Sequence, residues 1–128
     1  MDDRIRQTLD HGQTIDITTT GRRTGLPRRI EIVFHNIDGR IYISGIPRHR
    51  PRAWLLNLQA NSALTIHLTR GVLADLSATD RVITDLAERG QLIPSIARAW
   101  RRTDIDEMVA WSPLIEVTIP DYGVSAAA

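Results

Sequence analysis

Residues 18–29 read Thr-Thr-Thr-Gly-Arg-Arg-Thr-Gly-Leu-Pro-Arg-Arg and stand between two stretches in which apolar and polar residues alternate. The two glycines and the proline permit a tight turn whose backbone comes close to a ligand. The four arginines offer forked donors to phosphate or carboxylate groups, and threonine hydroxyls and backbone N–H groups can complete such a cradle. The stretch therefore predicts a hairpin turn that is either an anion-binding loop or a solvated basic loop.

Strands are predicted on both sides of this turn by alternation with a period of two. The predicted strands cover residues 14–20, 29–35, 40–46, 63–69, 72–77 and 114–119. The sequence Asn-Ile-Asp-Gly at residues 36–39 is a strong hairpin signal between the second and third of them. Sequential antiparallel strands with a late helical insertion favour a mainly β fold with appended helices, an antiparallel Greek-key barrel.

Helical segments are predicted at three places in the chain. A short N-terminal helix covers residues 2–11, with Asp2 or Asp3 as its cap, and a second helix covers residues 53–60. The insertion covers about 78–112, with helices from Thr79 to Gly90, over 93–101 and over 103–111. We expect a single barrel domain over residues 1–128, with a frayed tail after Gly123.

The overall composition excludes several classes of protein. Sixteen basic residues against fifteen acidic ones give a net charge of +1, which does not favour nucleic-acid binding. The absence of cysteine excludes disulfides and thiolate chemistry, and no histidine has partners at ligand spacing, so no metal site is expected. No apolar segment resembles a signal or a transmembrane span, so we expect a cytoplasmic protein.

The basic residues are nevertheless concentrated in one part of the chain. Eight arginines lie between Gly21 and Arg52, opposed only by Glu31 and Asp38. A second basic cluster, Arg-His-Arg-Pro-Arg at residues 48–52, follows the third predicted strand. Two such clusters in one small domain favour a compact polyanionic ligand over a nucleic-acid duplex.

The basic turn together with Pro-Arg-Ala-Trp-Leu-Leu-Asn-Leu-Gln-Ala-Asn at residues 51–61 resembles the deazaflavin (F420)-dependent nitroreductase family of the split β-barrel, flavin-binding superfamily. The resemblance extends over residues 15–119. It implies a flavin-reductase-like split barrel and a bound coenzyme F420, whose tail carries phosphate and oligoglutamate. It also implies an oxidoreductase that transfers a hydride to a small electron-poor acceptor such as a quinone, a nitro compound or an activated alkene.

The resemblance also implies which residues bind the coenzyme. Residues expected near the phosphate and tail are Arg22, Arg23, Thr24 and Arg28. Residues expected near the ring or its linker are Ser44, Gly45, Trp54 and Asn57, and Arg48 and Arg52 complete the candidates. The chain departs from the family at residues 46–49, where a Ser-Lys-Gly type of segment is usual. Family members that reduce nitro compounds also carry several tyrosines in the late helical region, close to the substrate, whereas residues 97–111 of this chain contain none. The acceptor therefore does not carry over from the family.

The sequence leaves the proton donor and the class of protein open. Hydride transfer leaves an anion on the acceptor that solvent or a side chain must protonate, and His49 and Tyr122 are the candidate proton donors. Two alternatives to an F420-dependent reductase are an oxidoreductase of the same fold that binds FMN and a non-catalytic protein that binds deazaflavin or another hydrophobic anion. The resemblance also favours a homodimer, since many split barrels of the superfamily form dimers.

Overall fold

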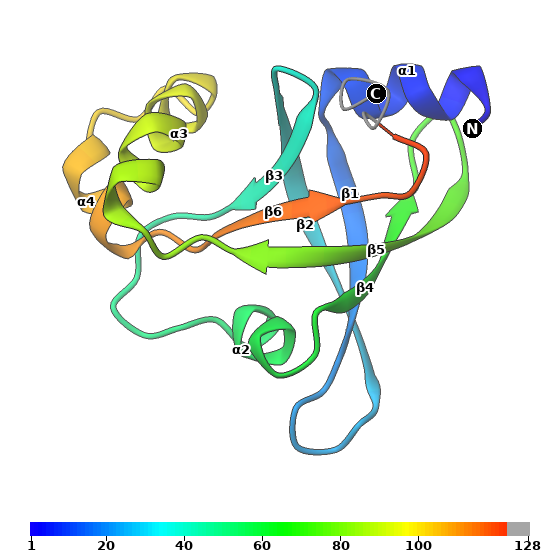
Figure 1. Cartoon of the computed structure of the whole chain (residues 1–128), viewed down its shortest axis with the longest axis horizontal. Helices are drawn as coiled ribbons and strands as arrows, with labels where there is room; N and C mark the ends of the chain where they lie inside the picture. The colour runs from blue at the N-terminus through cyan, green and yellow to red at the C-terminus, as the bar shows by residue number, and fades with distance from the viewer. Residues whose placement is uncertain (123–128) are drawn as a thin grey trace.

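Six antiparallel strands close into a barrel in the computed structural model, which describes residues 1–122 (Figure 1). The strands are β1 (Thr14–Thr20), β2 (Pro27–Ile37), β3 (Arg40–Ser44), β4 (Ala63–Leu68), β5 (Ala74–Val82) and β6 (Leu114–Thr118). Their order around the barrel is β1-β2-β3-β6-β5-β4, so β4 returns beside β1 as in a Greek key. The predicted fold class is confirmed. The frayed tail predicted after Gly123 lies outside the described residues.

Alternation along the strands places the apolar side chains inside the barrel. Ile15 and Ile17 of β1 are almost fully buried, and Ile17 pairs with Ile30 of β2 and Ile66 of β4. Burial of a side chain of this size contributes about 2 kcal/mol. The interior of the barrel is therefore the main source of stability.

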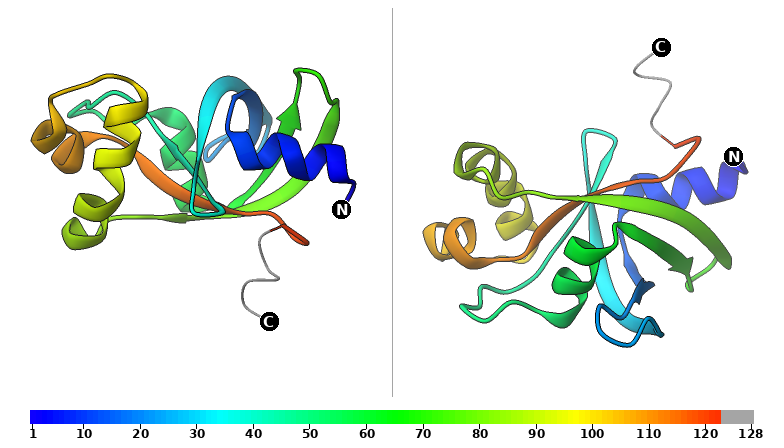
Figure 2. Two further views of the ribbon diagram at one scale, coloured as in Figure 1. Left: turned by 90° about the horizontal axis from the view of Figure 1, so that it is seen from above. Right: turned by 60° about the horizontal axis from the view of Figure 1, so that its bottom comes forward.

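Four helices surround the barrel: α1 (Asp3–His11), α2 (Ala53–Ala60), α3 (Leu86–Ala99) and α4 (Ile105–Trp111). Helices α1 and α2 lie at opposite ends of the barrel, and α3 and α4 lie together on one side of it (Figures 1 and 2). Asp2 caps α1 as expected, because its Oδ1 accepts a hydrogen bond of 2.7 Å from the N–H of Arg4. A second apolar cluster, which includes Tyr42 and Met108, joins α3 and α4 to the outside of the barrel.

The predicted start of the helical insertion is wrong. Residues 79–82 belong to β5, where Asp80 pairs with Val117 and Val82 pairs with Ile115 of β6. Pairing with β6 outweighs the helical spacing of the apolar residues that suggested a helix there. The glycine predicted to end that helix, Gly90, lies inside α3, which continues through Pro94 to Ala99.

Asp80 is an acidic residue whose side chain the barrel partly buries. Its Oδ2 is covered and has no hydrogen-bond partner, and burial raises the pKa of the carboxyl to about 6. Because this pKa is above that of the unfolded chain, the folded state binds the proton more tightly. The contribution of Asp80 to the free energy of unfolding therefore falls as pH rises from about 4 to about 6.

We expect Asp80→Asn to raise the free energy of unfolding at pH 7 by about 1–2 kcal/mol, a figure that allows for partial solvent screening. The gain should shrink at pH 4.5, where the wild-type carboxyl is protonated in the folded state. Urea denaturation at both pH values measures it, with Glu31→Gln as the exposed control. An equal gain at both pH values would contradict the assignment to the Asp80 charge.

Candidate functional site

The basic turn between β1 and β2 is closed by its own backbone. The N–H of Gly21 donates to the Leu26 carbonyl and the N–H of Gly25 donates to the Gly21 carbonyl, both at 2.8 Å. Gly25 has a φ of 70°, in the left-handed region that favours glycine. The Thr24 hydroxyl accepts from the N–H of Leu26 at 3.2 Å. This closure leaves the arginine side chains of the turn exposed.

The turn, the adjoining ends of β1 and β2 and one side of α2 line a groove of about 620 Å³, which we call the basic-turn groove. Six of the predicted coenzyme-binding residues line it: Arg22, Arg23, Thr24, Arg28, Trp54 and Asn57. No aspartate or glutamate lines the groove. Of the arginines that line it, Arg29 forms an ion pair with Asp16, with Nε and Oδ2 2.9 Å apart. Within residues 1–122, Arg22, Arg23 and Arg28 form no ion pair, so their charges are available to an anion.

Asn57 joins α2 to the basic turn. Its Nδ2 donates to the Thr19 hydroxyl at 3.1 Å and its Oδ1 accepts from the N–H of Arg22 at 3.0 Å, while only 4% of the residue is exposed. Because both ends of the amide are engaged, Asn57 sets the position of the turn. Trp54, one turn earlier on α2, packs into the barrel core and also borders the groove.

Ser44, predicted to contact the coenzyme ring, is buried, and Gly45, predicted to contact it as well, is half-buried. The Ser44 hydroxyl donates to the Pro113 carbonyl at 2.6 Å. A Cβ atom at Gly45 would lie 3.0 Å from the guanidinium of Arg52 and 3.2 Å from the ring of Pro113. Arg52 in turn donates to the Ile46 carbonyl at 2.7 Å. The structure does not bring these residues to the basic-turn groove.

The second basic cluster lines a different hollow, of about 270 Å³, which we call the arginine hollow. Arg48, His49, Arg50 and Arg52 lie along it, and it is bounded by α2, by the link from β5 to α3, and by the segment from the end of α4 to β6. At 100° per residue, Trp54 and Asn57 face one side of α2, and Leu55 and Gln59, which line this hollow, face the other. The predicted site is thus divided in two by α2.

The two candidate proton donors lie far apart. His49 is in the arginine hollow, stacked on Trp111 with ring centroids 4.0 Å apart, and its Nε2 is 3.5 Å from Glu107. The Tyr122 hydroxyl donates to Asp10 at 2.6 Å and accepts from Asn36 at 2.8 Å. Burial and the bond to Asp10 raise the pKa of Tyr122 to about 12. Tyr122 lines neither hollow and joins the segment after β6 to α1.

Sequence reasoning missed Arg89, a buried arginine of α3 that lines the arginine hollow. Its guanidinium donates to four carbonyls: Ile83 at 2.9 Å, Val109 at 2.6 Å, Met108 at 3.2 Å, and Ser112. Its charge has no carboxylate partner within residues 1–122. The sequence gives no signal for this role, because an arginine in an amphipathic helix usually points to solvent.

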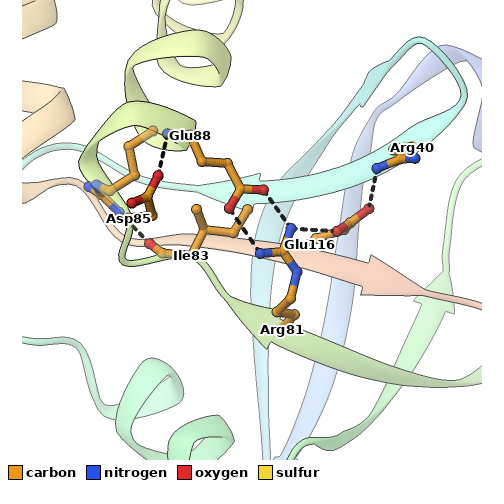
Figure 3. A network of polar contacts seen from close by, with 7 residues as sticks. Arg40, Arg81, Ile83, Asp85, Glu88 and Glu116 are labelled. Atoms are coloured by element: carbon orange, nitrogen blue, oxygen red, sulfur yellow. Dashed lines mark hydrogen bonds and ion pairs between the residues drawn. The ribbon is translucent and has the colours of Figure 1, made fainter.

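The beginning of α3 is also tied to the barrel by ion pairs on the outside of the sheet (Figure 3). Arg81 of β5 donates to both carboxylate oxygens of Glu88 at 2.9 and 2.6 Å and to Glu116 of β6 at 2.8 Å. Arg40 of β3 lies 3.7 Å from Glu116. This network and Arg89 together fix α3 and α4 against the barrel and so form one wall of the arginine hollow.

The closed antiparallel barrel with appended helices is the split-barrel fold, which solved structures of other proteins share. The chain belongs to the F420H(2)-dependent quinone reductase family, whose sequence model matches residues 2–119. It is therefore an oxidoreductase that uses coenzyme F420, and the predicted family, enzyme class and cofactor are confirmed. None of the helices in residues 1–122 combines the length and apolar character needed to cross a membrane.

Solved structures of other proteins show the same fold at low sequence identity. A conserved hypothetical protein from Mycobacterium tuberculosis is 16% identical, with a TM-score of 0.70 over 94% of this chain and 81% of that chain. A structure described as an F420 reductase is 15% identical, with a TM-score of 0.63 over 92% of this chain and 94% of that chain. A structure described as a domain-swapped dimer is 22% identical, with a TM-score of 0.60 over 91% of this chain and 92% of that chain.

Proposed function

We propose that the protein reduces a small quinone with a hydride from reduced F420, and that the basic-turn groove holds the phosphate and glutamate tail of the coenzyme. The observation that carries the proposal is the set of three arginines in that groove, Arg22, Arg23 and Arg28, which have no acidic partner within residues 1–122. Guanidinium groups suit both phosphate and carboxylate oxygens. The donors present therefore fit the anionic groups of the coenzyme.

The protein's own contribution is to bind and orient. When bound, the coenzyme supplies the hydride, so no nucleophilic residue is required. Asn57 sets the position of the basic turn, and Trp54 offers an aromatic face at the inner side of the groove. The acceptor gains two electrons and one proton with the hydride, and one further proton neutralises the resulting anion. His49, held beside Glu107, is the candidate that delivers this proton.

Arg23→Ala tests the place of the tail. The variant should bind F420 with a long oligoglutamate tail about tenfold more weakly, because one charge-assisted contact is lost, and the effect should shrink as glutamates are removed. Titration calorimetry measures both affinities, with Arg70→Ala in the turn between β4 and β5 as a control of equal charge. A loss that does not depend on tail length would contradict the proposal.

The alternatives of the sequence analysis are separated by parallel measurements. Tighter binding of FMN than of F420 would favour the FMN-binding version of the barrel. Tight F420 binding without oxidation of the reduced coenzyme by quinones or nitroaromatics would favour a non-catalytic binding protein. The family assignment favours the reductase, and its name specifies a quinone as the acceptor.

The cytoplasmic location and the single domain over residues 1–128 stay predictions. The homodimer is also part of the proposal, supported by the structural relative that is described as a domain-swapped dimer. Light scattering distinguishes a dimer from a monomer of 14.4 kDa.

A further inference from the structure

We propose that the outer face of the barrel carries a second active centre, in which Thr18, His67 and Asp75 cleave small uncharged esters by acyl transfer to the Thr18 hydroxyl. The three residues come from β1, β4 and β5, and β4 lies between the other two strands. None of the three lines the basic-turn groove or the arginine hollow. The activity needs no coenzyme and is independent of the proposed function.

The register of the strands brings the three side chains together. His67 pairs directly with Asp75, and Thr18 pairs with Thr65, which lies two residues before His67 on β4. Residues two apart on a strand point to the same face of the sheet. Ile66, next to His67 in the sequence, is buried inside the barrel, so His67 and its two partners lie on the outer face.

Two hydrogen bonds fix the direction in which a proton moves. Asp75 Oδ1 lies 2.7 Å from His67 Nδ1, and Thr18 Oγ1 lies 2.7 Å from His67 Nε2. A carboxylate only accepts, so His67 Nδ1 carries the hydrogen. In the neutral imidazole Nε2 is then an acceptor, and the Thr18 hydroxyl donates to it. A hydroxyl that donates to a base, which a carboxylate orients in turn, is the arrangement of an activated nucleophile.

The base is held in place, while the nucleophile faces a groove. Only 8% of His67 is exposed, so its ring keeps one orientation between the strands. Thr18 lines a groove of about 290 Å³, together with Thr65, Ser77 and, at the basic turn, Pro27. Among the described residues, none with a charged side chain lines this groove. A volume at the small end of ligand sites and walls without charge suit a short uncharged ester.

A second hydroxyl lies beside Thr18 on the outer face. Thr65 is opposite Thr18, and Ser77 is opposite Thr65, so hydroxyl residues of three strands form a row along the groove. Directly opposite side chains have Cβ atoms about 5 Å apart. When the Thr18 oxygen attacks a carbonyl carbon, negative charge develops on the carbonyl oxygen, and the Thr65 hydroxyl can donate to it.

The reaction balances with water as the only co-reactant. Thr18 Oγ1 bonds to the carbonyl carbon while His67 Nε2 takes the hydroxyl proton. The bond from that carbon to the alcohol oxygen breaks, and His67 returns the proton to the leaving alcohol. Water then attacks the acyl-threonine with His67 again as the base, which releases the carboxylic acid and restores Thr18. Asp75 touches no reacting atom and is a positioning residue.

Hydrolysis of p-nitrophenyl acetate by the protein without coenzyme tests the proposal. We expect a burst of p-nitrophenolate before a slower steady release, and mass spectrometry during the burst should find an acetyl group on Thr18. Thr18→Val removes the hydroxyl at nearly constant shape and should abolish the burst, whereas Thr18→Ser should retain it. Thr14→Val, on the outer face of the same strand, is the control and should behave as wild type.

Histidine variants separate this centre from the slow reaction of surface imidazoles with the ester. His67→Gln should lower the rate of acylation about a hundredfold. His11→Gln, which removes an exposed histidine of α1, should leave the rate unchanged. Asp75→Asn should also slow acylation, because an amide can donate to His67 Nδ1 and so favours the tautomer in which Nε2 carries the hydrogen.

The affinity for F420 keeps this proposal apart from the proposed function. It should be unchanged in every variant, because none of the replaced residues lines the basic-turn groove, and circular dichroism should show that each variant folds. Failure of the wild type to bind F420 would contradict the proposed function alone. A burst of equal size in Thr18→Val, acetyl groups only on other residues, or no release above that in buffer would overturn the esterase proposal.

Discussion

Replacing Arg89 with methionine is expected to lower the free energy of unfolding by about 2–4 kcal/mol. Methionine retains most of the aliphatic packing of the arginine but leaves carbonyls of Ile83, Met108, Val109 and Ser112 without their donor. These carbonyls come from the end of α4 and from the link between β5 and α3. The loss therefore falls on the junction that holds the helical layer to the barrel, and urea denaturation measures it.

The matched control is Arg98→Met, an exposed arginine in the last turn of the same helix. It should change the free energy of unfolding by less than about 0.5 kcal/mol. Arg89→Lys should recover only part of the loss, because an ammonium group cannot reach four carbonyls with a fixed fork of donors. Equal stability of Arg89→Met and Arg98→Met would show that the buried guanidinium contributes nothing.

Asn57→Ala is expected to weaken binding of F420 about thirtyfold and to lower the free energy of unfolding by about 2 kcal/mol. The substitution removes the acceptor of the Arg22 N–H and the donor to the Thr19 hydroxyl, so the basic turn loses its attachment to α2. The arginines stay in the chain but are no longer held in one arrangement. Calorimetry with F420 and urea denaturation measure the two effects.

Asn57→Asp separates positioning from charge. Its carboxylate still accepts from the Arg22 N–H, which should restore part of the lost stability, but it adds a negative charge beside the groove. We therefore expect F420 with a long tail to bind this variant less well than F420 with a short tail. Gln59→Ala, on the opposite side of α2, is the control and should leave F420 binding unchanged. Normal F420 affinity in Asn57→Ala would remove the positioning role.

Alternation of apolar residues was sufficient to predict most of the barrel. The turn from β2 to β3 could be predicted because aspartate and glycine tolerate positive φ, and Asp38 and Gly39 have φ values of 53° and 85°. The end of β5 could not be predicted, because Val82, Ile83 and Leu86 have helical spacing. Only the pairing with β6 makes residues 79–82 a strand.

The candidate site was predicted in composition but not in arrangement. Both basic clusters line hollows, as the density of arginine indicated. Their separation depends on which side of α2 each cluster meets, and that is set by how the helix packs at the barrel end. The resemblance predicts Ser44 and Gly45 near the coenzyme ring, and in the structure the Ser44 hydroxyl donates to the Pro113 carbonyl while the Arg52 side chain lies close to Gly45. Residue type alone does not report such coverage.

The closed order of the six strands has a consequence for how the molecule meets other chains. Every strand in the described part of the chain has two neighbours, yet β2 pairs with β1 over residues 27–33 and with β3 only over residues 34–37. Likewise, β5 pairs with β4 over residues 74–79 and with β6 only over residues 79–82. Each long strand therefore has a stretch with one side unpaired, and a second copy that added a strand to the barrel would have to pair there.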